Sequence, residues 1–113
     1  MGRWKSSEAR GLSFFFAAKE HIQRYLKTGE IAELQCAKDY LVTGTKFARR
    51  DVNPIVASAL FNGAAIVEYL LNPVQNVLPS KWFKIAANLK DKSGSSTLNA
   101  IYADKNLETL KLK

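Results

Sequence analysis

The sequence predicts an all-α protein, with two amphipathic helices, one apolar helix, a short C-terminal helix and an irregular tail. Three observations lead to this prediction. Apolar residues recur at three- and four-residue steps through the first fifty positions, which is the period of an amphipathic helix. A nearly uncharged run fills positions 54–71, and an Asn-Pro dipeptide stands at each of its ends. With 113 residues, the chain has the size of one domain.

The first helix is predicted over positions 7–27. The apolar stripe consists of Leu12, Phe15, Ala18, Ile22 and Leu26, and the polar side is predicted to carry Lys19, Glu20, Gln23 and Arg24. Three consecutive phenylalanines at 14–16 make the apolar face wide and aromatic. Thr28-Gly29 is predicted to end the helix, because glycine readily takes the left-handed conformation found at many helix ends.

The second helix is predicted over positions 30–43. Glu30 and Glu33 fall in its first turn, where the helix dipole favours acids, and its apolar stripe consists of Ile31, Leu34, Ala37 and Leu41. Gly44 is predicted to end it. Cys36 is the only cysteine, which excludes an intrachain disulfide, and we expect it to be a small apolar packing residue.

The third helix has the clearest boundaries. Asn53 is a good N-cap, and Pro54 stands where its missing N–H costs nothing. Asn72-Pro73 closes the helix, because a residue before proline avoids helical geometry. Its eighteen residues would span about 27 Å, slightly less than a hydrocarbon core of about 30 Å. The segment is either the buried central helix of a soluble protein or a membrane span among partner helices.

The insertion energy of this helix does not decide between the two alternatives. Each of its strongly apolar side chains contributes about −0.3 to −0.6 kcal/mol, and the single acid Glu68 costs about +2.5 to +3.5 kcal/mol at a central position. The sum is close to zero, so a membrane span here would depend on neighbouring helices. After it, a short helix is predicted beyond Pro79-Ser80, a flexible loop over 91–96, and a short helix with an extended tail over 97–113.

Composition narrows the function classes. The net charge of +7 predicts an acidic partner, which is nucleic acid, anionic lipid or an acidic subunit. The pattern offers no catalytic residues, no cofactor-binding loop and no metal site, since one histidine and one cysteine cannot form the usual zinc ligand set. We therefore expect a protein that is not an enzyme.

Two groups of residues are candidate contact sites. For helix–helix packing, Ala59 and Gly63 have the small-xxx-small spacing, Asn62 can hydrogen-bond across such a contact, and Glu68 can accept a bond from a neighbouring helix. For lipid headgroups or phosphate, the candidates are Lys46, Arg49 and Arg50 in the basic connector before the third helix, with Phe47 available for stacking on a base.

The order of several short motifs resembles subunit g of the mitochondrial F-type ATP synthase. The resemblance covers about residues 10–71, a little over half of the chain. Its strongest part is Ala59-Leu-Phe-Asn-Gly63 followed by Glu68, and its other parts are residues 14–19, 29–31, 38–42 and 43–47. Two features depart from the family pattern: Ala59 replaces the first glycine of the usual GxxxG pair, and about forty residues follow the span.

The resemblance implies a non-catalytic structural subunit of the mitochondrial inner membrane that supports dimerisation of the synthase and membrane curvature. The chain would then divide into an amphipathic region over 1–50, a membrane-spanning helix over 51–73 and a C-terminal extension over 74–113. The implied partners are a subunit e-like helix and anionic lipid such as cardiolipin. The alternatives are a small basic all-helical nucleic-acid-binding or ribonucleoprotein subunit, and a soluble scaffold that oligomerises through the third helix.

Overall fold

The computed structural model describes residues 6–48, 53–91 and 93–112, and five α-helices account for most of them. The helices are α1 (Ser6–Thr28), α2 (Ile31–Ala48), α3 (Pro54–Leu71), α4 (Val77–Ala87) and α5 (Leu98–Thr109). The predicted all-α class is confirmed, since the described residues form no β-strand and only one isolated bridge, between Lys90 and Ser96.

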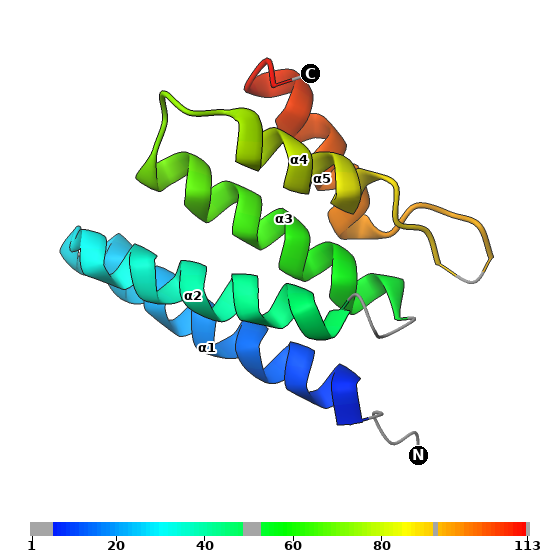
Figure 1. The fold of residues 1–113 in the computed structure, drawn as a ribbon, viewed down its shortest axis with the longest axis horizontal. Coiled ribbons are helices and arrows are strands. Elements are labelled where there is room, and N and C mark those ends of the chain that lie inside the picture. Colours follow the sequence, from blue (N-terminus) through cyan, green and yellow to red (C-terminus); the bar gives the residue numbers. More distant parts are fainter. Residues whose placement is uncertain (1–5, 49–52, 92, 113) are drawn as a thin grey trace.

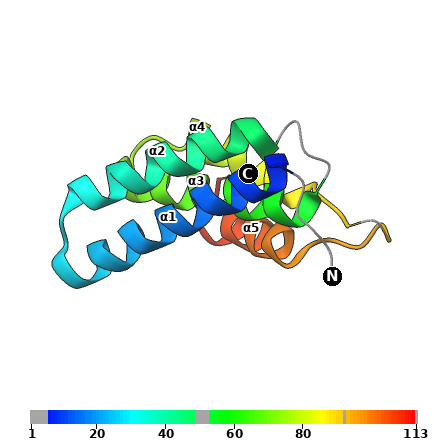
Figure 2. The same cartoon turned by 90° about the horizontal axis from the view of Figure 1, so that it is seen from below.

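The helices form two layers. Helices α2 and α4 lie in one layer, while α1, α3 and α5 lie in the other, and each helix packs on the next one in the chain (Figures 1 and 2). Both α1 and α5 contact α3, but they do not contact each other, and neither do α2 and α4. Helix α3 is therefore the centre of the bundle, and it contacts all four other helices.

Helix α3 supplies much of the core because its apolar side chains point toward α2 and α4. Ala64 and Ala65 are fully buried, and Leu60 is equally inaccessible. Their main neighbours from other helices are Leu34 and Leu41 of α2 and the aromatic and small side chains of α4, namely Trp82, Phe83 and Ala86. The apolar segment 54–71 is thus covered along most of its surface by its own chain.

The predicted C-terminal end of α1 and both ends of α3 form where the sequence places them. Asn53 caps α3 through its side-chain Oδ1, which accepts hydrogen bonds from the N–H groups of Ile55 and Val56 at 3.0 and 3.4 Å. Gly29 ends α1 with a φ of +72°, and its N–H donates to the carbonyl of Tyr25. A short turn between α1 and α2 follows, because glycine takes this conformation without steric cost.

The α1–α2 pair is joined by aromatic and polar contacts. His21 Nδ1 lies 2.6 Å from Glu33 Oε2, and the same imidazole stacks on Tyr40. Near the other end of the pair, the rings of Phe14 and Phe47 stack with their centroids 5.6 Å apart.

The prediction that Gly44 ends the second helix is wrong, because α2 continues to Ala48. Gly44 is buried and lies against Leu60 of α3. A Cβ atom at this position would be 2.7 Å from Leu60 Cδ2 and 3.2 Å from Phe14 Cβ. The glycine therefore serves close packing among α1, α2 and α3, and the helix tolerates its unfavourable propensity. The prediction for Cys36 is also wrong, since this cysteine is exposed on α2.

The irregular tail is a further wrong prediction, because α5 extends to Thr109 and the chain then turns back. Lys111 takes a φ of +55°, and its N–H donates to the Glu108 carbonyl. The N–H of Leu112 donates to the Leu107 carbonyl, which completes a Schellman motif. Leu107 and Leu112 are both buried, and this pair of apolar residues holds the end of the chain against the bundle.

We predict that Gly44→Leu destabilises the protein by about 2 kcal/mol or more, because the cost of overpacking exceeds the helix-propensity gain of about 1 kcal/mol. Urea unfolding followed by Trp fluorescence measures this change. Ala32→Leu is the matched control, since Ala32 is exposed in the same helix. Equal stability of the two variants would show that α1, α2 and α3 do not require a glycine at this contact.

Candidate functional site

The residues predicted to pack helices together lie on different sides of α3. Gly63 faces α2, where a Cβ atom would be 3.2 Å from Leu41 Cδ2. Asn62 is buried and faces α5, and its Oδ1 accepts a hydrogen bond from Asn106 Nδ2 at 3.3 Å. Ala59 is half-buried between them. The close contacts of Gly63 and Asn62 are thus made within the chain, and a contact with a foreign helix remains a prediction.

Glu68 forms a buried ion pair that joins α3 to α2. Its side chain is almost fully buried, and its Oε2 lies 2.6 Å from Lys38 Nζ. The contact is an ion pair without a well-directed hydrogen bond to Oε2. The other oxygen, Oε1, accepts a hydrogen bond from Asn72 Nδ2 at 3.0 Å. No local pattern indicates Lys38 as the partner of Glu68, because thirty residues separate the two.

The basic connector is described only in part. Lys46 is exposed in the last turn of α2, whereas Arg49 and Arg50 lie outside the described residues. Phe47, considered for stacking on a base, is half-buried and engaged within the protein. Its ring stacks on Phe14, and the Arg10 guanidinium carbon lies 5.4 Å from the ring centroid.

A broad apolar surface remains on the layer of α1, α3 and α5, on the side away from α2 and α4. We call it the open face. It consists of three stripes at helical spacing, one from each helix: Phe15, Lys19, Ile22 and Leu26; Ile55, Ala59, Ile66 and Leu70; and Leu98, Tyr102, Lys105 and Thr109. In Figure 2, α1 and α5 lie below α2 and α4.

Contacts between helices place the first half of α1 and the second half of α5 beside α3. A Cβ atom at Gly11, one turn before Phe15, would meet Val56 and Leu60 of α3. Phe15 and Ile22 accordingly pack at the edge of the core. Asn106 of α5 meets Asn62 of α3, which is buried one turn before Ile66.

The apolar residues of α3 on this face are strongly exposed for a central helix. Ile55 is 60%, Ile66 38% and Leu70 47% exposed. On α5, Leu98 and Tyr102 are also exposed. The sequence does not indicate this face, since apolar residues lie all round α3 and mark no side of it as open. Leu98, Ala100 and Tyr102 alternate with other residues as in a β-strand, so the local pattern does not indicate the helical stripe of α5.

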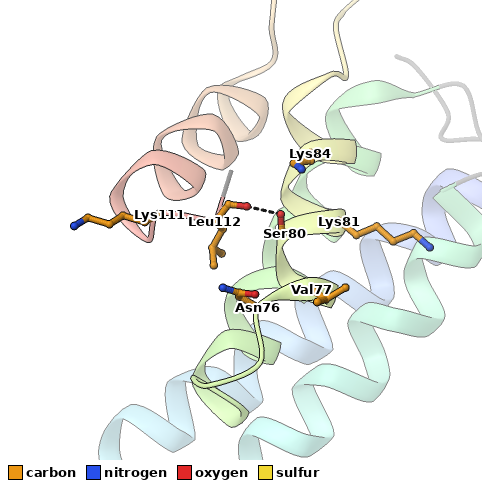
Figure 3. A pocket seen from close by; sticks show the side chains of 7 residues that line it. All are labelled: Asn76, Val77, Ser80, Lys81, Lys84, Lys111 and Leu112. Atoms are coloured by element: carbon orange, nitrogen blue, oxygen red, sulfur yellow. Dashed lines mark hydrogen bonds between the residues drawn. The ribbon is translucent and has the colours of Figure 1, made fainter.

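A cavity of about 500 Å³ lies between α4 and the end of the chain, but its lysines do not converge. Ser80 Oγ donates a hydrogen bond to the Leu112 carbonyl across it. Figure 3 shows the side chains of Lys81 and Lys111 pointing in opposite directions. An anion in the cavity would therefore not be held by Lys81 and Lys111 together. The described residues contain no group of three His, Cys, Asp or Glu side chains placed to hold a metal ion.

The loop before α5 contains one carboxylate with a shifted pKa. Asp91 Oδ1 accepts hydrogen bonds from the N–H groups of Ser93 and Ser95 at 2.9 and 3.0 Å, and from the Ser93 hydroxyl. The bond from the Ser93 side chain makes the largest contribution to lowering the pKa of Asp91, because it favours the ionised form. Since Asp91 is exposed at a turn, these bonds order the loop and point to no ligand.

Comparison with known proteins gives no relative: no family model, curated protein or solved structure matches this chain.

We predict that Lys38→Met destabilises the protein by about 2 kcal/mol, because it leaves a buried carboxylate without a counter-charge. This value is below the usual range for breaking a buried pair, since Lys38 is itself one-third exposed. The double variant Lys38→Met/Glu68→Leu should recover most of the loss, as an apolar pair carries no desolvation penalty. Urea unfolding of both variants measures the difference. A double variant no more stable than the single one would contradict this account.

Proposed function

We propose that the protein is a non-catalytic helical subunit that acts by binding another component of a larger assembly. The open face is the observation that carries this proposal. Monomeric soluble proteins rarely leave a contiguous apolar surface across three helices, and such surfaces usually bind a partner or a membrane. The net charge of +7 adds that the bound component is acidic.

The middle of the open face gives the sharpest test. We predict that Ile66→Ser releases the protein from its native complex, because the substitution places a hydroxyl in the apolar contact. Ile101→Ser is the matched control: Ile101 is 43% exposed, against 38% for Ile66, but it lies outside the three stripes. Size-exclusion chromatography of extracts measures whether each variant elutes in a complex or as a 12.6 kDa monomer.

Circular dichroism of both variants establishes that the helical fold is retained. A shift of Ile101→Ser to the monomer together with Ile66→Ser would mean that apolar exposure in general, and not the open face, holds the complex. Persistence of the complex in Ile66→Ser would refute the proposed role of the face.

A subunit g-like membrane protein is the second proposal, and α3 is the observation that favours it. Pro54–Leu71 is the one helix in the described part of the chain that is long and apolar enough to cross a membrane. The mitochondrial inner membrane, a subunit e-like partner helix and cardiolipin belong to this second proposal alone. It requires α3 to leave the bundle, because α2 and α4 carry exposed charges that a bilayer would not accept, among them Lys46, Lys81 and Lys84.

Alkaline carbonate extraction of membranes from the native source separates the two proposals. If α3 stays inside its own bundle, we predict that carbonate releases the protein into the supernatant, since only a peripheral contact is broken. A membrane span instead stays in the pellet until detergent is added. Retention in the pellet would therefore replace the first proposal with the second.

A further inference from the structure

The two outer stripes of the open face each contain one lysine. Lys19 lies one turn from Phe15 and one turn from Ile22, so it belongs to the stripe of α1 and the prediction that it falls on the opposite side is wrong. Lys105 lies one turn beyond Tyr102 in the stripe of α5. Both lysines are exposed, and the three stripes contain no acidic residue. The face therefore combines an apolar central stripe with one positive charge on each flank.

This charge pattern disfavours a second copy of the chain as the occupant. Two copies joined by a two-fold axis would bring identical faces together. Lys19 and Lys105 of one copy would then meet the same lysines of the other, with no acid in either face to neutralise them. The net charge of +7 on each copy adds to the repulsion.

The same pattern favours a protein helix over a bilayer surface. Membrane-binding helices separate their cations onto a polar face, away from the apolar residues that enter the lipid. Here Lys19 is bracketed by Phe15 and Ile22 in one stripe, so a bilayer that received these apolar side chains would also receive the charge. A partner helix can instead place a carboxylate opposite each lysine.

We infer that the open face binds an acidic amphipathic helix of a partner protein. This inference rests on the proposed function and adds the class of partner. The stripe of α3 from Ile55 to Leu70 is about 22 Å long, which matches about fifteen helical residues. The partner packs apolar residues at positions i, i+3, i+4 and i+7 on this stripe, and half-buried Ala59 leaves room for a larger side chain in the middle. Carboxylates on its flanks pair with Lys19 and Lys105.

The test uses a designed amphipathic peptide of about eighteen residues, with leucines at this spacing and glutamates on both flanks. Fluorescence anisotropy gives the affinity for the full-length protein, and amide chemical shifts locate the contact. We expect micromolar binding with shifts along α1, α3 and α5. The double variant Lys19→Glu/Lys105→Glu should weaken binding at least about tenfold, which is 1.4 kcal/mol. A second peptide with lysines in place of the glutamates should bind this variant better than it binds the parent protein.

Lys81→Glu/Lys84→Glu is the matched control, because it makes the same change of charge on exposed lysines of α4. An equal loss of affinity in the control would show that the weaker binding comes from the change in net charge alone, and it would overturn the inference. So would the absence of peptide binding at about 1 mM. A third contrary result is stronger binding to phosphatidylcholine vesicles with about one-third phosphatidylglycerol, since it would assign the face to lipid. Release of Ile66→Ser from the native complex, with no effect of the Lys19/Lys105 reversal on it, would refute this inference and leave the proposed function standing.

Discussion

Helix α3 has to be covered on most of its surface, because its eighteen residues include one charged side chain, Glu68, and are otherwise largely apolar. Helices α2 and α4 provide this cover, and the remaining architecture follows from it. Each of them is joined by a short connection to α3, and each packs on one outer helix, α1 or α5, which completes the two layers. Burial of α3 therefore determines both the core and the position of the surface that stays open.

Close packing on α3 depends on small and polar residues at a few contacts. Gly44 of α2 allows the Leu60 side chain of α3 to approach its backbone. In the same way, Gly63 of α3 allows the Leu41 side chain of α2 to approach. The polar groups that enter the core have partners: Glu68 pairs with Lys38, and Thr97 Oγ1 donates to Ser58 Oγ at 2.8 Å. A buried polar group without such a partner would carry a large desolvation cost. These contacts therefore fix how the helices pair as well as how strongly they associate.

The open face follows from the same geometry. Helices α2 and α4 cover α3 more completely than α1 and α5 do, because each of them has a more extensive contact with α3. Ile55, Ile66 and Leu70 stay accessible for this reason. These residues can be buried only by a partner, and the proposed function is the binding of such a partner. The basic connector has no comparable role among the described residues, since Phe47 is occupied by Phe14 and Arg10.

The sequence by itself determined the helical class and the ends of α3, because these depend on local effects: periodicity, the cap at Asn53 and the restriction before Pro73. The predictions from local pattern were wrong for Gly44, for Cys36 and for the C-terminal tail. Gly44 continues its helix because Leu60, which is distant in sequence, packs against it. The local sequence around Gly44 does not show this contact. The partner of Glu68, the cover on α3 and the alignment of the three stripes were likewise decided only by the tertiary structure, since each joins residues that no local pattern connects.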